Sequence, residues 1–262
     1  MENLFLFKAA FVGILTAISA SFIGNFLVAK RQSMLSDMLS HSAILGVSIG
    51  YFLNFNPLYF AILISTLSAL MLNKLSRGNK RPKEAISVML LNGALALAYV
   101  FSHLAKDLNF NFENFLFGSI LSINTNEVAL SMLLCLVTVI TVSFNYKKLL
   151  TIAFDRDYAL SLGYKVRFFE NLFILLASLL IGINLKIIGG LLISAFLIIP
   201  VLCASNFCKN FKHNIIFSCL FSCSSVIIGL LTSYFFDIPS SSAIVLSLIL
   251  FFGISSLKKV SN

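Results

Sequence analysis

Charged residues are scarce in this sequence. Asp, Glu, Lys and Arg together make up 11% of its 262 residues, whereas ordinary soluble domains contain about 25%. Tryptophan is absent and only 4 prolines are present, so positions that break helices are few. Hydrophobic residues account for 59%, and the mean hydropathy is +0.98. This composition excludes an ordinary soluble domain. It predicts an all-α, polytopic transmembrane helix bundle that forms a single domain over residues 1–262.

Two motifs that would indicate catalysis or nucleotide binding are missing. The Walker A pattern GxxxxGK[ST] does not occur, so the chain does not bind ATP by that route. The HExxH pattern of metalloproteases does not occur either. Asp37 is the only aspartate inside an apolar segment, so a pair of aspartates within the bilayer lacks its second member. An intramembrane enzyme is therefore disfavoured, and a transport or channel function is expected.

Cysteine is present in an odd number and without the spacing of a zinc finger. All the cysteines lie in or beside apolar segments, where we expect reduced thiols packed as small hydrophobic side chains. They are Cys135, Cys203, Cys208, Cys219 and Cys223. The i, i+4 spacing of Cys219 and Cys223 leaves a metal-binding thiolate pair as an alternative.

Long apolar runs are what the sequence does contain. They predict about nine membrane spans, with eight as the alternative if two short segments fuse. The segments cover roughly 4–29, 33–53, 57–73, 85–104, 126–145, 169–185, 187–206, 214–236 and 240–257.

The positions of Lys and Arg predict the orientation. If the amino terminus faces outside, all basic residues except Lys8, Lys106 and Lys186 fall on the inner connections. Inner connections of membrane proteins carry an excess of Lys and Arg. The net charge of +9 then reflects topology and attraction to anionic lipid, so nucleic acid is not an expected partner. An odd number of spans places the carboxyl terminus inside.

Two connections are longer than a turn. In the outer one, residues 114–121 are too few to span the bilayer and too apolar for a free loop, which predicts a short interfacial or re-entrant helix. In the inner one, residues 154–163 read as a short cytosolic helix, with Asp155 as its N-cap and Gly163 at its end. Tyr158 and two leucines would face outward. The helix is either a docking element for another protein or a purely structural interfacial helix.

Asp37 and His41 form the candidate metal site. They lie four residues apart in an apolar segment, so on a helix their side chains share one face. Zn²⁺ accepts imidazole nitrogen and carboxylate oxygen, whereas Mn²⁺ prefers more oxygen ligands. Two ligands are too few for a tight site, which suits an ion that must leave as well as enter. The alternatives are a polar pair that hydrogen-bonds other helices, and an ion pair between Asp37 and Arg31.

Further ligands would have to come from water or other helices. Asn92, His103 and Ser194 qualify by polarity, although a histidine at the outer end of a helix is more often interfacial. His213 is flanked by lysines and is expected to be solvated. Asp237 precedes a proline and is expected to cap the last helix.

Five motifs, in one order along the chain, resemble the ZnuB-like permeases of bacterial ABC importers for zinc and manganese. They are Arg31 with Asp-Met-Leu-Ser-His-Ser-Ala at 37–43 and Gly46, Phe-Leu-Phe-Gly-Ser-Ile-Leu at 115–121, the helix at 155–163, Gly-Leu-Leu-Ile-Ser-Ala at 190–195 with Ile199-Pro200, and Asp-Ile-Pro-Ser at 237–240. Ser36, Met38 and Ser241 depart from the residues that this family often has.

The resemblance implies a BtuC-like permease that acts as a homodimer in the bacterial cytoplasmic (inner) membrane. It further implies two cytosolic ATPase subunits, which would bind the ATP, and an extracytoplasmic metal-binding protein that delivers the ion. The permease itself would be no enzyme and would hold no cofactor. Its metal residues would be Asp37 and His41, and its ATPase-coupling residues Asp155, Ala159, Leu162 and Gly163. Zinc is the expected cargo, with manganese or iron as the alternative ions. An ATP-independent metal carrier is the alternative mechanism.

Overall fold

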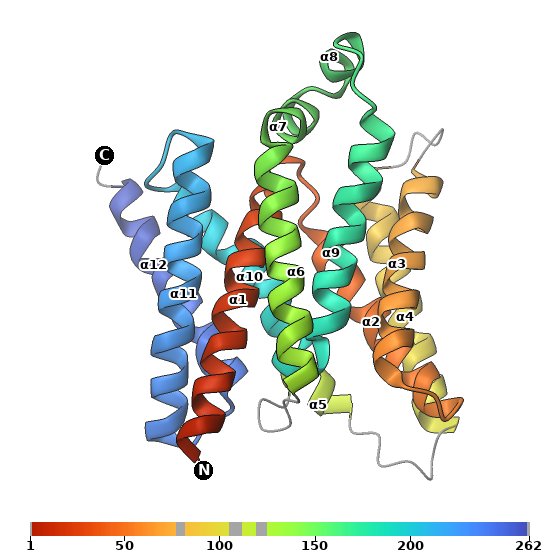
Figure 1. Ribbon diagram of the computed structural model, residues 1–262, viewed down its shortest axis with the longest axis vertical. Coiled ribbons are helices and arrows are strands. Elements are labelled where there is room, and N and C mark those ends of the chain that lie inside the picture. Colours follow the sequence, from red (N-terminus) through yellow and green to blue (C-terminus); the bar gives the residue numbers. More distant parts are fainter. Residues whose placement is uncertain (1, 77–81, 105–111, 119–124, 261–262) are drawn as a thin grey trace.

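The protein is a bundle of α-helices that run mostly along one common direction (Figure 1). A computed structural model describes residues 2–76, 82–104, 112–118 and 125–260. The helices are α1 (Glu2–Ala29), α2 (Met34–Phe52), α3 (Pro57–Leu75), α4 (Lys83–Leu104), α5 (Phe112–Phe117), α6 (Thr125–Phe144), α7 (Tyr146–Phe154), α8 (Arg156–Ser161), α9 (Val166–Ile188), α10 (Gly190–Ser205), α11 (Phe211–Phe236) and α12 (Ser240–Val260).

Each of the nine predicted apolar segments forms a long helix, which confirms the predicted fold class. In the described part of the chain, 7 helices are long and apolar enough to cross a membrane. The two predicted spans outside that set are α2, which carries Asp37 and His41, and α10, which has only 16 residues. The short helices are α5, α7 and α8. Helix α5 begins two residues before the predicted start at 114, and α7 was not predicted.

The two helices that fall short of a typical span lie inside the bundle. Helix α2 packs against α3, α4, α9 and α10, while α10 packs against α1, α11 and α12 as well. The two ends of the chain lie at opposite ends of the bundle, and α7 and α8 lie at the carboxyl-terminal end (Figure 1). We call this end, which carries the predicted inner connections, the α7–α8 end.

Close backbone contact between α2 and α3 depends on Gly46. A Cβ atom at this position would lie 2.3 Å from the carbonyl oxygen of Phe60. The two helices can therefore approach only because glycine has no side chain, as is common in membrane bundles. This contact fixes the position of the helix that carries the candidate metal residues.

Helix α5 covers the turn between α9 and α10. Gly118, after α5, and Gly189, in the turn, both have positive φ, of 75° and 90°. A Cβ atom on either glycine would lie 2.5 Å from the backbone of the other segment. Non-helical backbone at membrane depth must be covered by protein or line a cavity, and α5 provides that cover. The predicted short helix is confirmed over Phe112–Phe117; residues 119–121 of the predicted range lie outside the described residues.

Polar side chains connect the spans inside the bundle. Asn184 of α9 accepts hydrogen bonds from Thr16 of α1 (3.1 Å) and Ser131 of α6 (2.8 Å). Asn25 of α1 donates to Ser218 of α11 at 2.8 Å. Interhelical hydrogen bonds of this kind each stabilise membrane bundles by roughly 0.6 kcal/mol on average. They hold α1, α6, α9 and α11 in a fixed arrangement around the two inner helices.

Candidate functional site

The turn before α2 is held in a defined shape. The Gln32 amide donates to the Leu27 carbonyl and the Arg31 amide to that of Val28, both at 3.0 Å. This is the Schellman pattern that ends many helices, with Arg31 in the left-handed position that glycine usually occupies (φ 54°). The chain therefore reverses within residues 30–33 and places Asp37 in the first turn of α2.

Asp37 and His41 lie on the one partly open face of α2. Both side chains are half-buried, whereas Met38, Leu39 and Ser40 are buried. The helical repeat places them on the same side with Met34, which is 46% exposed. The two side chains are near enough to interact electrostatically. A carboxylate and an imidazole are thus available together at the edge of a buried helix.

Unpartnered polar atoms concentrate at this point. The Nδ1 atom of His41 and the hydroxyl oxygens of Ser40 and Ser42 are buried and have no hydrogen-bond partner among the described residues. Most buried polar atoms in proteins are hydrogen-bonded, so each exception needs an explanation. A transiently bound cation would supply a partner for an imidazole nitrogen, which is a common metal ligand.

The described residues contain neither of the interactions that the alternative interpretations of Asp37 and His41 require. Arg31 is exposed, and the ion pairs of the described residues do not include Arg31–Asp37. Neither Asp37 nor His41 forms a side-chain hydrogen bond to another described helix. The hydrogen-bonded polar pair and the pair with Arg31, which the sequence left open, are therefore not formed in this conformation.

The other candidate ligands do not complete a metal cage. Asn92 is exposed and donates to Val88, His103 is exposed at the end of α4, and Ser194 donates to Leu191. Among the described residues, no group of three or more His, Cys, Asp or Glu side chains could hold a metal ion together. The Cys219–Cys223 pair consists of free thiols and joins no such group. Asp37 and His41 are therefore an open pair of candidate ligands, the arrangement expected for passage of an ion rather than its storage.

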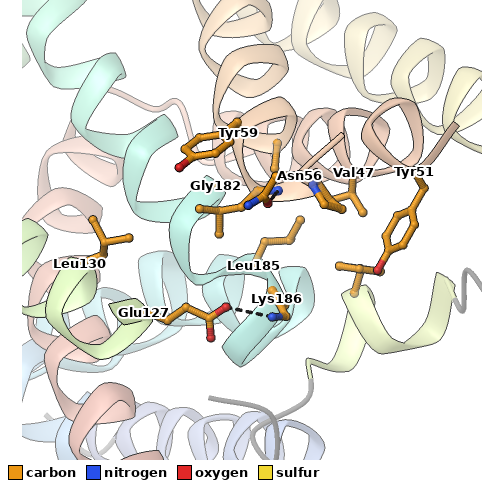
Figure 2. Close-up of a pocket in the computed structure, with 13 residues that line it drawn as sticks. Val47, Tyr51, Asn56, Tyr59, Glu127, Leu130, Gly182, Leu185 and Lys186 are labelled. Carbon is orange, nitrogen blue, oxygen red and sulfur yellow. Dashed lines mark hydrogen bonds and ion pairs between the residues drawn. The ribbon is translucent and has the colours of Figure 1, made fainter. Parts of the chain in front are cut away.

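A cavity lies at the opposite end of the bundle, and no sequence pattern predicted it. Its volume is about 350 Å³. Its lining includes Lys186 of α9 and Glu127 of α6, which form an ion pair with 2.9 Å between the ammonium nitrogen and a carboxylate oxygen (Figure 2). Tyr51 and Tyr59 line other parts of its wall. The scarcity of charge near the predicted outer ends of the helices was the signal that could have singled out Glu127 and Lys186.

Helix α8 has the predicted caps. Asp155 accepts hydrogen bonds from the amides of Asp157 (3.0 Å) and Tyr158 (2.9 Å), and Gly163 has φ 75°. These caps satisfy backbone groups at both ends and so stabilise a short helix that lies away from the bundle.

The side chains of α8 divide into an outer and an inner set. Tyr158, Leu160 and Leu162 are 56%, 49% and 47% exposed. Ala159 is fully buried, so it seats the helix and offers no contact surface of its own. An exposed apolar face on a helix at the α7–α8 end is the kind of patch that marks a protein interface.

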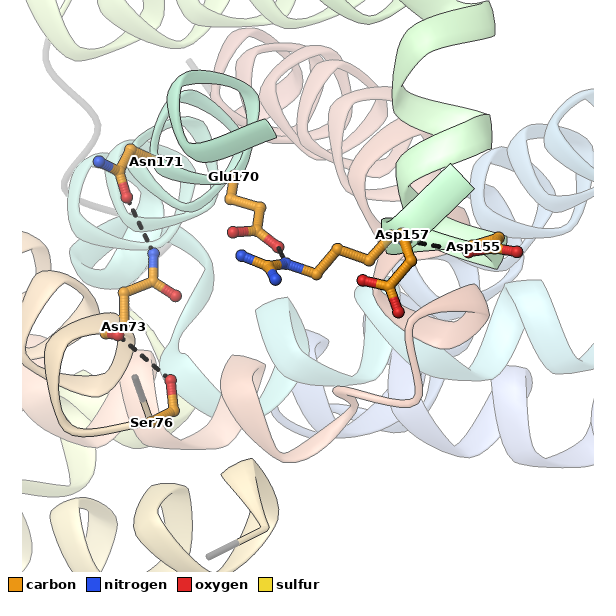
Figure 3. A network of polar contacts seen from close by, with 7 residues as sticks. Asn73, Ser76, Asp155, Asp157, Glu170 and Asn171 are labelled. Carbon is orange, nitrogen blue, oxygen red and sulfur yellow. Dashed lines mark hydrogen bonds and ion pairs between the residues drawn. The ribbon is translucent and has the colours of Figure 1, made fainter. Parts of the chain in front are cut away.

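Glu170 connects α8 to the rest of the bundle. Its carboxylate lies 3.4 Å from the guanidinium of Arg156 (Figure 3). It also attracts the ammonium of Lys30, just before α2, whose pKa is lowered to about 8 by burial despite this attraction. Asn171, the next residue, accepts a hydrogen bond from Asn73 of α3 at 3.1 Å. Glu170 thus stands between the exposed helix and the turn that leads to Asp37.

Comparisons with known proteins agree with this architecture. Residues 2–259 match the model of the ABC 3 transport family. The chain is 28% identical to the high-affinity zinc uptake system membrane protein ZnuB of Haemophilus influenzae, over 97% of each chain. It is also 28% identical to the manganese import system permease protein ScaB of Streptococcus gordonii, over 96% of this chain and 90% of that one.

A solved structure has the same fold. It is PsaBC from Streptococcus pneumoniae in complex with Fab, with a TM-score of 0.84 and 26% identity over 96% of this chain and 90% of that chain. A family match along nearly the whole sequence, on a bundle of apolar helices without a nucleotide-binding motif, assigns a membrane transport role rather than a catalytic one. The chain belongs to the ABC 3 transport family and is a multi-pass ABC transporter permease.

Proposed function

We propose that this chain is the permease subunit of an ATP-driven importer for a divalent metal ion, with zinc as the preferred cargo. The observation that carries the proposal is the partly open Asp37–His41 face on α2, with a buried imidazole nitrogen that has no hydrogen-bond partner among the described residues. The mixed nitrogen and oxygen pair favours zinc over manganese. Relatives named for each metal support import of a divalent cation in general.

Asp37 and His41 would form a transient binding site for the cation during alternating access. Asp37 supplies negative charge that offsets part of the dehydration of the cation, and His41 supplies a neutral nitrogen donor. Remaining ligand positions would be filled by water, since no third strong ligand joins the pair in the described residues. Loose coordination allows the ion to leave once access changes sides.

Energy would enter through α8. We infer that two cytosolic ATPase subunits contact its exposed face on a homodimer of this chain, with the amino terminus outside and the carboxyl terminus inside the bacterial cytoplasmic membrane. An extracytoplasmic metal-binding protein would deliver the ion at the opposite end. Movement of α8 would reach α2 through Arg156, Glu170 and Lys30, because Glu170 interacts with both cations.

The test is uptake of radioactive zinc into vesicles that contain the permease, its ATPase and its delivery protein. His41→Ala and Asp37→Asn are each expected to reduce ATP-dependent uptake at least roughly tenfold, the factor that corresponds to about 1.4 kcal/mol. His213→Ala is the matched control, because that imidazole is exposed at the α7–α8 end.

Each outcome of this assay has a defined meaning. Uptake unchanged in both site variants would make Asp37 and His41 structural residues. Competition by a small excess of Mn²⁺ would reassign the cargo to manganese. Uptake that persists without the ATPase would favour an ATP-independent carrier.

A further inference from the structure

A groove at the α7–α8 end lies between helices that are distant in sequence. It has a volume of about 590 Å³. Its walls come from the end of α6, the start of α7 and the start of α11, together with α1 and the α8–α9 turn. The lining residues are Phe22, Val142, Ser143, Phe144, Tyr146, Lys147, Lys148, Tyr164, Lys212, Ile215 and Ile216.

The groove is divided into a cationic rim and an apolar wall. The rim carries Lys147, Lys148 and Lys212, all exposed. The wall carries Phe144, 85% exposed, and Ile216, 56% exposed. The rim lies at the ends of two candidate membrane spans, α6 and α11, that reach the α7–α8 end, so we expect it at the depth of lipid headgroups.

Within the part of the chain that the structure describes, no carboxylate neutralises the positive charge of the rim. The ion pairs within the described ranges are Arg156–Glu170 and Lys186–Glu127, so no carboxylate pairs with the rim lysines there. Two of the ammonium groups lie over aromatic rings instead, Lys148 at 5.3 Å and Lys212 at 5.6 Å from the ring centres. Such contacts orient a cation and leave its hydrogen-bond donors available for an anion.

Tyr146, which lines the groove, belongs to an aromatic cluster. The ring of Tyr146 lies 6.3 Å from that of Phe26 and 6.1 Å from that of Phe211, and Phe26 also contacts Phe173. The ring of Tyr146, at the start of α7, is therefore packed between rings of α1 and α11, and Phe26 links this pair to α9. Its hydroxyl, like that of Tyr164, can donate a hydrogen bond to a phosphate oxygen.

We propose that this groove binds the headgroup of one anionic phospholipid, with the phosphate on the lysine rim and the acyl chains along the apolar wall. A free phosphate ion would use the rim but gain nothing from Phe144 and Ile216. A zwitterionic lipid would cover the wall but bring a positive group to the lysines. Only a lipid with net negative charge matches both halves of the groove.

The bound lipid would connect α7 to α11 beside the exposed helix α8. This inference needs only a membrane-spanning chain, so it stands independently of the metal proposal. Each lysine near an anionic lipid surface contributes roughly a fivefold factor in affinity. Loss of all three charges should therefore weaken binding roughly a hundredfold.

The experiment uses the purified full chain in lipid nanodiscs that contain phosphatidylglycerol or phosphatidylcholine, followed by native mass spectrometry of retained lipid. The groove variant is Lys147→Gln/Lys148→Gln/Lys212→Gln. The control, Lys74→Gln/Arg167→Gln/Lys209→Gln, removes the same charge from exposed residues outside the groove. We expect wild type and control to retain phosphatidylglycerol and the groove variant to lose it. Replacement of the three lysines by arginine should preserve binding and shows that the rim tolerates substitution.

Several results would overturn the inference. Equal loss in both Gln variants would indicate general surface charge, and equal retention of phosphatidylcholine by wild type would remove the selectivity for anionic lipid. Displacement of the lipid by inorganic phosphate would indicate a simple anion site. If the groove variant kept phosphatidylglycerol but no longer bound the ATPase, the rim would be a protein contact instead.

Discussion

At the scale of single residues, burial and charge conflict at a few positions along α2 and its preceding turn. His41 has a buried nitrogen that finds no hydrogen-bond partner in the described ranges, and Arg31 occupies a left-handed conformation that disfavours side chains larger than hydrogen. Lys30 is an amine whose ammonium form is penalised by burial. Such costs are tolerated mainly where they serve a function, and here they precede or belong to the candidate metal site.

The titration of Lys30 provides a prediction at this scale. Its pKa is about 8 in the folded protein and 10.5 ordinarily, so between these values the unfolded chain binds more protons. The free energy of unfolding should therefore increase as the pH rises from about 8 to about 10.5, and this gain should be absent below the lower value. Lys30→Met removes the titrating group and should flatten this part of the pH profile of the melting temperature.

Lys30→Arg is the companion variant, because it keeps a charge that does not titrate in this range. It should flatten the profile as well. If both variants kept the wild-type slope, another group would be responsible. The groups that face Lys30 are Glu170, which raises its pKa, and Lys83 and Arg156, which lower it.

At the scale of helices, α2 depends on backbone contact with α3. Gly46→Ala places a Cβ atom against the Phe60 carbonyl and should destabilise the protein by roughly 1–3 kcal/mol. Gly93→Ala is the control, since no heavy atom lies within 4 Å of the added Cβ. Denaturation in mixed detergent would compare the two. Equal stability would mean that α2 and α3 separate at little cost.

Helix α9 connects the exposed α8 to the start of α2, and Glu170 is the connecting residue. Glu170→Gln removes the partner of Arg156 and the carboxylate that attracts Lys30, which Lys83 and Arg156 repel. Under the proposed function, the amount of metal imported per ATP hydrolysed should fall severalfold while ATPase activity persists.

Glu84→Gln is the matched control for this variant, because it removes an exposed carboxylate at the same end of the bundle. The ratio of uptake to hydrolysis in reconstituted vesicles is the measurement. The same ratio in both variants would exclude Glu170 from coupling.

Some of these elements can be read from the sequence and others cannot. Helical periodicity places Asp37 and His41 on one face, so their proximity follows from spacing alone. The pairs Glu127–Lys186 and Arg156–Glu170 join separate helices, and no local pattern predicts which helices meet. Helix α7 was missed because Asn145 ends α6 without a glycine or proline to mark the break.

At the scale of the whole molecule, the helix order leads to a topological prediction. The two chain ends lie at opposite ends of the bundle. The positive-inside rule predicts that the α7–α8 end faces the cytosol. A green fluorescent protein fused to the carboxyl terminus should therefore fluoresce in cells, and alkaline phosphatase fused there should be inactive. An active phosphatase fusion would show that the carboxyl terminus lies outside the cytosol. The proposed ATPase contact on α8 would then lie on the wrong side of the membrane.

The shortness of α10 affects the whole transporter. Its 16 residues span about 24 Å at 1.5 Å per residue, less than the hydrocarbon thickness of about 30 Å. Its first turn packs against α5, with Gly190, Leu192 and Ile193 buried and Leu191 40% exposed. Under the proposed function, an ion that passed beside α10 and α2 would cross a dielectric barrier thinner than the surrounding bilayer. The distance over which the ion would lack its hydration shell would then be set by this one helix rather than by the lipid.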